Sequence, residues 1–285
     1  MPEVAMNGTS PNGLSKVPQD AASAFRTMLS NGEGLVAPGV FNAVTALLAE
    51  KQGFKVGYFS GGAFAVEMGL PDIGLFSLTE LADAVRRITS VSTIPLVVDA
   101  DTGFGEPVNV MRTVTELEAA GAAAVHLEDQ AMPKRCGHLD GKQLISREAM
   151  LQKILAAKEA RKGRIVIIAR TDARSTLGMS AAIGRACAYL EAGADVIFPE
   201  ALESLEEFRE FAREVQAPLV ANMTEFGKTP YIEAERFHKA GFKLVLFPQS
   251  AFRVALKAVA DVYRELMTSG TQSNLIESMM TRREI

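Results

Sequence analysis

The chain has 285 residues, and its 30 basic and 34 acidic side chains give a net charge of −4 at pH 7. Its composition of 48% hydrophobic and 22% charged residues is that of a globular protein and excludes a wholly disordered chain. No apolar run reaches the roughly 18–20 residues of a membrane span, and no basic stripe interleaved with aromatic residues is present, so we expect neither a membrane nor a nucleic acid partner.

The cysteine count and the start of the chain indicate the compartment. Cys136 and Cys187 form neither a disulfide framework nor the spacing of a metal site. The first 22 residues lack the charged start and apolar middle of a secretory signal, and the polar run over 7–13 cannot pack. We therefore expect a cytoplasmic protein with a flexible tail over residues 1–22 and one folded domain over 23–285.

Short apolar runs alternate with helical segments through the folded part. The predicted strands cover residues 35–40, 56–60, 95–100, 123–128, 165–170, 196–199, 219–222 and 244–247. Clear helical periodicity covers residues 77–88, 108–120, 147–160 and 181–192. A glycine that can end a helix precedes the next strand at Gly53, Gly121, Gly193 and Gly241.

This order of strands and helices predicts the fold. Each helix returns the chain to the start of the sheet, so the strands must pair in parallel. Eight such repeats in about 250 residues predict a closed (β/α)₈ barrel of the TIM type, with an open doubly wound sheet as the alternative. In such barrels the reactive groups lie at the carboxyl ends of the strands.

Polar residues follow most of the predicted strands. They are Ser60-Gly61-Gly62, Asp99-Ala100-Asp101, Glu128-Asp129, Arg170-Thr171-Asp172, Glu200, Asn222-Met223-Thr224, and Ser250 with Arg253. A chain that needed only stability would not require charged groups from so many separate strands at one mouth. We therefore expect a functional site there.

Asp99 and Asp101 stand two residues apart, on the same side of a strand end. Mg²⁺ prefers oxygen ligands, commonly one or two carboxylates with water and substrate oxygens. Glu128 and Asp129 on the neighbouring strand can complete such a site or hold its waters. The alternative is helix capping or a solvated turn, but the second acidic pair favours a magnesium site.

Two further groups suit an anionic substrate. Ser60, Gly61 and Gly62 offer a hydroxyl and backbone N–H groups that can bind a carboxylate or phosphate, although a plain tight turn explains them equally well. Arg170 and Arg253 are candidates for bidentate binding of carboxylates, with a surface salt bridge as the alternative for each.

The segment Lys134-Arg135-Cys136-Gly137-His138 places a thiol in a polar loop. Neighbouring positive charge is expected to lower the pKa of this thiol, which would make it a proton donor or nucleophile near neutral pH. Gly137 and Gly141 allow the loop to bend as a lid does. A Schiff-base aldolase would need a lysine at a strand end, and the strand-end residues include none.

At these residues the chain resembles the isocitrate lyase/phosphoenolpyruvate mutase superfamily. The resemblance runs from about Leu35 to Arg282 and lies in residues 58–62, 69–72, 98–105, 127–130, 134–138, 169–172, 198–201, 222–227, 270–272 and 281–282. Among its branches the chain is most similar to the one that cleaves 2-methylisocitrate to pyruvate and succinate with Mg²⁺. Cleavage of dimethylmalate, hydrolysis or decarboxylation of oxaloacetate, and a carboxyphosphonoenolpyruvate mutase reaction are the alternatives.

The resemblance also implies residue roles. Asp99 and Asp101 would hold Mg²⁺, and Cys136 would be the catalytic acid. From the reaction itself, Tyr58 or a metal-bound water is the candidate base, and His138 and Glu128 are further candidate catalytic residues. The implied substrate contacts are Ser60, Gly61, Gly62, Cys136, Gly137, Arg170, Glu200, Asn222, Met223, Thr224, Arg253 and Arg282. The family further implies a homotetramer that exchanges its C-terminal helices between subunits and binds a small di- or tricarboxylate.

Overall fold

Eight parallel strands close into a barrel in the computed structural model, which describes residues 20–284. The strands are β1 (Leu35–Pro38), β2 (Gly57–Phe59), β3 (Leu96–Asp99), β4 (Ala124–Glu128), β5 (Val166–Thr171), β6 (Val196–Pro199), β7 (Val220–Asn222) and β8 (Leu244–Phe247). They pair in the orders β2-β3-β4-β5-β6 and β1-β8-β7. Single parallel bridges from Gly39 to Tyr58 and from Ile197 to Leu219 join the two sheets. The predicted barrel and all eight strands are confirmed.

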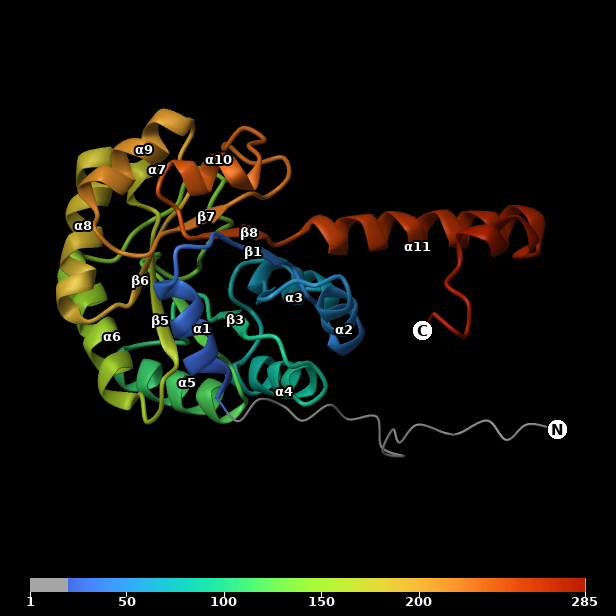
Figure 1. The fold of residues 1–285 in the computed structure, drawn as a ribbon, viewed down its shortest axis with the longest axis horizontal. Coiled ribbons are helices and arrows are strands. Elements are labelled where there is room, and N and C mark those ends of the chain that lie inside the picture. The colour runs from blue at the N-terminus through green and yellow to red at the C-terminus, as the bar shows by residue number, and fades with distance from the viewer. Residues whose placement is uncertain (1–19, 285) are drawn as a thin grey trace.

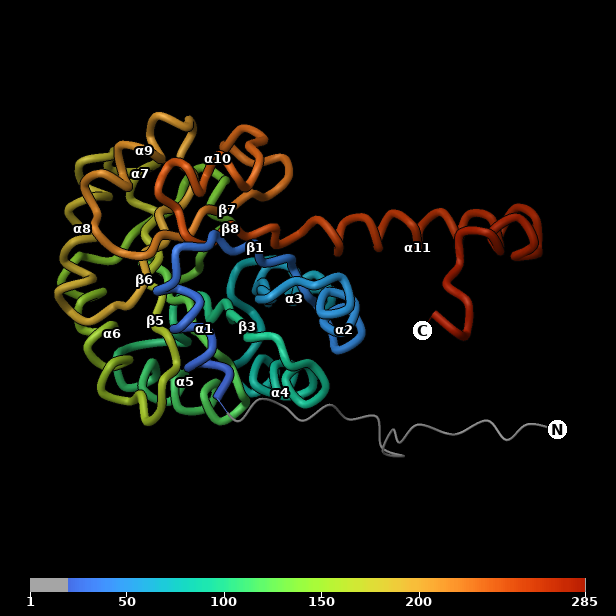
Figure 2. Tube along the Cα trace, in the orientation of Figure 1, coloured from blue at the N-terminus to red at the C-terminus, as the bar shows by residue number. Residues whose placement is uncertain are grey.

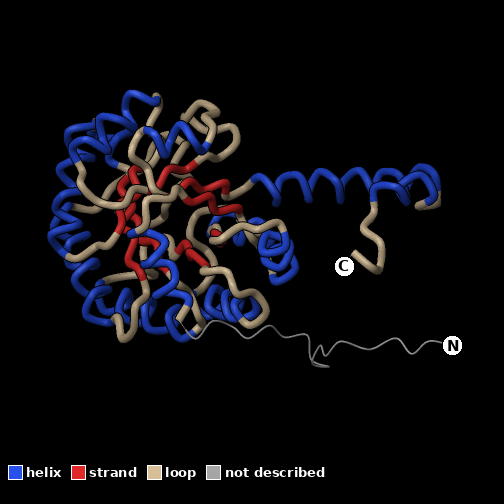
Figure 3. The backbone as a smooth tube through the Cα atoms, viewed as in Figure 1, coloured by secondary structure: helices blue, strands red, loops and turns tan. Residues whose placement is uncertain are grey.

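Helices surround the strands, as Figure 1 and Figure 3 show. They are α1 (Ala21–Ser30), α2 (Ala43–Lys51), α3 (Gly61–Glu67), α4 (Leu78–Thr89), α5 (Pro107–Ala119), α6 (Arg147–Ala160), α7 (Ala173–Leu177), α8 (Met179–Ala192), α9 (Leu205–Glu214), α10 (Ala234–Lys239) and α11 (Ser250–Ser269), with a 3₁₀ helix at Ser273–Ser278. Helix α4 begins with a capping box between Ser77 and Glu80. Gly193 ends α8 in the left-handed conformation, at a φ of 115°.

The strands are buried on both faces, as a parallel barrel requires. Every residue of β3, β4 and β5 is buried. One apolar cluster lies between strands and helices, and a second fills the barrel interior, with side chains such as Val97, Val166 and Val220. This packing leaves the carboxyl ends of the strands as the place for polar groups.

Helix α1 closes the amino end of the barrel. Its Phe25 is fully buried and belongs to the interior cluster. Arg26 donates to Asp195 at 2.9 and 3.0 Å, which fixes the helix to the start of β6. Of the tail predicted over residues 1–22, residues 1–19 lie outside the described residues, whereas Ala21 and Ala22 are helical.

Helix α11 extends away from the barrel (Figures 1 and 2). It covers 20 residues and ends at Gly270 in the left-handed conformation. Several of its apolar side chains are exposed, among them Val254, Tyr263 and Met267. Among the described residues, no helix is both long enough and apolar enough to span a membrane.

Candidate active site at the carboxyl mouth of the barrel

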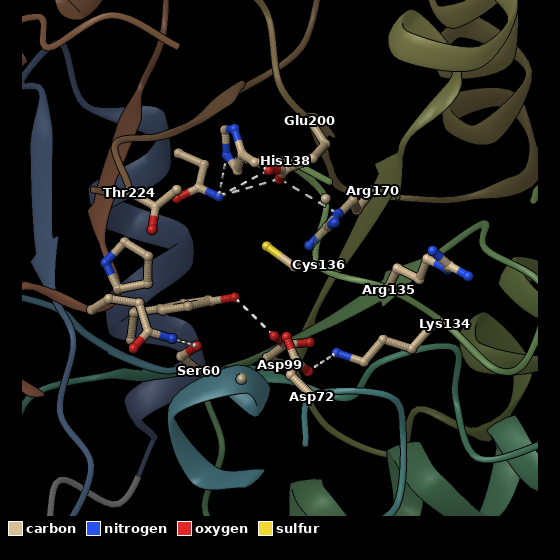
Figure 4. A pocket seen from close by; sticks show the side chains of 16 residues that line it. Ser60, Asp72, Asp99, Lys134, Arg135, Cys136, His138, Arg170, Glu200 and Thr224 are labelled. Atoms are coloured by element: carbon tan, nitrogen blue, oxygen red, sulfur yellow. Dashed lines mark hydrogen bonds and ion pairs between the residues drawn. The ribbon is translucent and has the colours of Figure 1, made fainter. Parts of the chain in front are cut away.

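A polar cavity lies at the carboxyl ends of the strands, and Figure 4 shows the side chains around it. The predicted residues that line it are Tyr58, Ser60, Gly62, Asp99, Cys136, Gly137, His138, Arg170, Glu200, Asn222 and Thr224. The free space is about 60 Å³, which holds a few water molecules. A larger molecule therefore needs the surrounding loops to move before it can bind.

Asp99 is the centre of the acidic side of the cavity. Its carboxylate accepts hydrogen bonds from the N–H of Gly61 at 3.1 Å and from the hydroxyl of Tyr58 at 3.3 Å. It also accepts one from the N–H of Asp101 at 3.1 Å, which ties the two predicted metal ligands together. Gly61 therefore orients an aspartate, whereas the sequence predicted that its N–H would bind substrate.

A cation fits beside Asp99. One ligand atom each from Asp99, His126 and Glu128 lies within 4.8 Å of the others, and all three side chains are buried. Oε1 of Glu128 has no hydrogen-bond partner among residues 20–284. Unpaired buried carboxylate oxygen is costly unless a cation compensates it, so the residues present suit a divalent ion.

Crowding of the acidic groups disturbs their ionisation. Burial, with the nearby charge of Asp99, raises the pKa of Asp101 to about 7. Burial also raises the pKa of Glu128 well above its usual range. Burial lowers the pKa of His126 to about 4, which leaves its imidazole neutral at pH 7.

Mg²⁺ binding is therefore expected to depend on pH. The folded chain holds a proton on Asp101 that the unfolded chain would release, so the metal-free fold loses stability as pH rises from about 4 through about 7. Binding of Mg²⁺ must expel that proton, so titration calorimetry should give an affinity at least about tenfold weaker at pH 6 than at pH 8. Asp101→Asn should lower by about one the number of protons released when Mg²⁺ binds. An unchanged slope of log affinity against pH would contradict the assignment.

Lys134 enters the cavity from the loop after β4 and corrects one sequence argument. Its ammonium pairs with Asp101 at 2.8 Å and with Asp72. The expectation that no lysine lies at a strand mouth was therefore wrong. A Schiff base is disfavoured for a different reason: burial alone would lower the pKa of Lys134, but the carboxylates around it raise the pKa, and the amine stays protonated.

Arg170, at the end of β5, provides the positive charge on the opposite side of the cavity. It donates to Asp172 at 2.9 and 3.1 Å and lies 3.3 Å from Glu128. Its guanidinium stacks over Phe198, 5.4 Å from the ring centroid. The Arg170 fork is thus held rigidly, and it is placed to bind a carboxylate that enters the cavity.

Glu200 and His138 form the upper wall in Figure 4. Nε2 of His138 lies 2.8 Å from Glu200, and Nδ1 of His138 accepts the N–H of Lys228 at 3.0 Å. Because Nδ1 accepts a hydrogen bond, Nε2 carries the proton that His138 donates to Glu200. Burial acts to raise the pKa of Glu200, but the Arg170 charge and the His138 hydrogen bond lower it below its usual range.

Cys136 lies between the two sides of the cavity, and its thiol differs from the prediction. In Figure 4 the sulfur lies between Asp99 and Arg170, whereas the Arg135 side chain points away. Burial raises the pKa of Cys136 above its usual range, so the expected lowering by neighbouring positive charge is wrong. A thiol that keeps its proton at neutral pH is a proton donor and a poor nucleophile.

Tyr58 also keeps its proton. Burial and the charge of Asp99 raise the pKa of its phenol well above the usual range. In this structure Tyr58 is a hydrogen-bond donor to Asp99 and is poorly suited to the predicted role of base.

The remaining predicted residues do not line the cavity. Those that are buried beside it are Gly61, Asp101, Glu128 and Met223. Arg253 lies on α11, near Glu225 at 3.6 Å and over the ring of Phe226. Arg282 is exposed in the segment that follows α11 and is not among the residues that line the cavity.

Sequence reasoning missed several residues of the site. No site role was predicted for His126, Asp72, Pro248 or Gln249, yet His126 lies in the buried ligand cluster and the other three line the cavity. Asp72 belongs to the motif over residues 69–72, which was the available signal.

Fold and site together define a (β/α)₈ barrel with a cation site and a carboxylate-binding arginine at its carboxyl mouth. Residues 25–267 match the model of the phosphoenolpyruvate phosphomutase family. The chain belongs to this family, which lies in the isocitrate lyase/phosphoenolpyruvate mutase superfamily.

Individual relatives span nearly the whole chain. A 2-methylisocitrate lyase of Aeropyrum pernix is 56% identical, over 91% of this chain and 84% of that protein. A 2-methylisocitrate lyase of Halalkalibacterium halodurans is 48% identical, over 95% of this chain and 90% of that protein. The crystal structure of a 2,3-dimethylmalate lyase superposes with a TM-score of 0.88 at 36% identity, and the match covers 93% of this chain and 90% of that chain. That of a phosphonopyruvate hydrolase complex with oxalate and Mg²⁺ gives 0.84 at 31% identity, covering 93% of each chain.

Proposed function

We propose that the chain is a Mg²⁺-dependent carbon–carbon lyase that cleaves 2-methylisocitrate to pyruvate and succinate. The observation that carries the proposal is the placement of the protonated Cys136 thiol between the carboxylate cluster and Arg170. The relatives named 2-methylisocitrate lyase, at 48–56% identity, support the choice of substrate.

The reaction breaks the bond between the hydroxyl-bearing carbon and its neighbour. The hydroxyl passes its proton to a water molecule in the cavity, its carbon becomes the keto carbon of pyruvate, and the bond electrons pass to the neighbouring carbon. That carbanion needs one proton to become succinate. Cys136 donates this proton from its thiol, the role for which its raised pKa suits it.

The other residues bind and orient. Asp99, Asp101 and Glu128 would hold Mg²⁺, which supplies Lewis acidity toward the oxygens of the substrate when bound. The phosphonopyruvate hydrolase complex with Mg²⁺ supports this cofactor. Arg170, with Asn222 and Thr224, binds the carboxylates of the departing fragment. The loop that carries Cys136 excludes water until the carbanion is protonated.

The experiment that tests the function incubates the pure protein and Mg²⁺ with 2-methylisocitrate, isocitrate, 2,3-dimethylmalate and oxaloacetate. Mass spectrometry identifies the products. We expect pyruvate and succinate from 2-methylisocitrate, no turnover in chelator, and recovery when Mg²⁺ is restored. Slower cleavage of related acids is expected, because one methyl group contributes only about 1–3 kcal/mol of discrimination. Faster turnover of another acid, or full activity in chelator, would contradict the proposal.

We further propose a cytoplasmic homotetramer that exchanges α11 between neighbouring subunits. The two unpaired cysteines agree with a reducing compartment. The side chains of Tyr263 and Met267 are 68% and 89% exposed, an apolar surface that a partner subunit would cover. The exchange would also carry Arg282 toward a neighbouring subunit, which would explain why it does not line the cavity of its own chain.

Sedimentation velocity tests the assembly. The wild type is expected to sediment as a tetramer, and the double variant Tyr263→Glu/Met267→Glu as smaller species, because two charges oppose burial of that face. Arg209→Glu, on the exposed face of α9, makes an equal change in net charge and should leave the tetramer intact. A monomeric wild type would refute the assembly.

A further inference from the structure

The backbone on both sides of Cys136 is held by two buried side chains. On one side, Gln130 accepts the N–H of Arg135 at 3.0 Å and donates to the carbonyl of Arg135 at 2.8 Å. On the other side, the ammonium of Lys142 donates to the carbonyl oxygen of Gly137. The two residues adjacent to the thiol are therefore each fixed through main-chain atoms.

Lys142 connects this loop to the substrate side of the cavity. Its side chain is 1% exposed, and its ammonium also pairs with Asp172 at 2.9 Å. The same carboxylate accepts two hydrogen bonds from Arg170. A continuous chain of contacts therefore runs from the backbone at Gly137 to the guanidinium that faces the cavity.

Two other side chains also anchor the loop: Lys134 pairs with Asp72 and Asp101, and His138 pairs with Glu200. Residues 131–143 contain no helix or strand. The ends of the loop meet through the bridge between Gln130 and Leu144, and the N–H of Ala131 donates to Gln143 at 2.8 Å. These bonds close the base of the loop, several residues from the sulfur. Unlike the side-chain anchors at Lys134 and His138, Gln130 and Lys142 bind the main chain of the two residues next to Cys136.

We propose that Lys142 and Gln130 are positioning residues that fix the Cys136 thiol toward one face of the carbanion. Neither touches the substrate; both act through the backbone next to Cys136. The inference rests on the proposed function for its catalytic meaning, whereas the positioning itself can be measured without turnover. A displacement of about 1 Å at a reacting group can cost about 10²-fold in rate.

The first experiment alkylates the protein with iodoacetamide and follows Cys136 and Cys187 by peptide mass spectrometry. Lys142→Met and Gln130→Met are expected to speed modification of Cys136 by about tenfold, because a released loop opens more often. The matched control is Lys153→Met. Lys153 is as buried as Lys142 and also donates to a backbone carbonyl, that of Thr102 at 2.9 Å, but it does not contact the loop. Its loss should leave the modification rate of Cys136 unchanged.

The second experiment runs 2-methylisocitrate cleavage in D₂O, where the exchanged thiol delivers a deuteron. The wild type is expected to give succinate labelled on one prochiral face. Both variants should give a mixture of faces, a kcat reduced by about 10²-fold and a KM changed by less than about threefold. Gln130→Met leaves the Lys142–Asp172 pair intact, so it tests the proposal even if Lys142→Met fails to fold.

Native alkylation rates in both variants would overturn the proposal. The proposal would also be overturned if melting temperature and kcat fell together while labelling stayed stereospecific. The two residues would then only stabilise the fold. Absence of 2-methylisocitrate cleavage by the wild type would refute the proposed function instead. The alkylation result would still decide whether Lys142 and Gln130 fix Cys136.

Discussion

Replacement of Cys136 by serine is expected to lower kcat by about 10²–10⁴-fold, the range that a positioned general acid contributes. A serine hydroxyl is a far weaker acid than a thiol, so the carbanion would wait for a proton from another source. The thiol is half-buried and accepts a hydrogen bond from the backbone N–H of His138, which a serine hydroxyl can also accept, so its replacement should change the melting temperature little. Steady-state kinetics and calorimetry measure these effects.

Cys187→Ser is the control for Cys136→Ser. Cys187 lies on α8, packed against the apolar cluster outside the barrel and away from the cavity. Its replacement should leave kcat unchanged. Mg²⁺ affinity should be the same in both variants, because neither sulfur contacts the carboxylate cluster. A Cys136→Ser enzyme with near-normal kcat would remove the thiol from the mechanism.

Arg170→Met is expected to destroy both activity and much of the stability. The buried guanidinium compensates Glu128, Asp172 and Glu200, and its loss leaves those carboxylates without their main counter-charge. Removal of one partner from a buried ion pair costs about 3–5 kcal/mol of unfolding free energy. Chemical denaturation should show this loss, and kcat/KM should fall below detection.

Two variants distinguish a general loss of charge from the loss of this site. Arg174→Met removes a partly exposed arginine from α7, paired with Glu203 and Glu207, and should cost only about 1 kcal/mol without affecting KM. Arg170→Lys restores the charge but lacks the bidentate fork, so it should regain stability more than substrate affinity. Equal losses in Arg170→Met and Arg174→Met would contradict the role of Arg170.

Local sequence patterns predicted the barrel and much of the site. Strands such as Val196–Pro199 are continuous apolar segments, and Gly193 marks the end of the helix that precedes this strand. Because the polar residue after a strand must lie at the mouth, the strand ends led directly to Asp99, Arg170 and Glu200.

The remaining features depend on contacts between distant segments. Lys134 meets Asp72, 62 residues earlier in the chain, and no local pattern reveals that pair. The pKa of Cys136 follows from burial, which depends on how its loop folds over the mouth. The charged residues next to Cys136 in the sequence suggested a lowered pKa instead. That prediction was wrong because the side chains of neighbouring loop residues can point in different directions.

The closed floor of the barrel has a kinetic consequence. Phe25 fills the end opposite the site, so incoming acid and both outgoing fragments share one route past the Cys136 loop. Each catalytic cycle then needs at least one opening of that loop, and its opening frequency sets a ceiling on turnover however fast the bond breaks. If opening of the loop, and not cleavage of the bond, limits turnover, then kcat should fall as solvent viscosity rises.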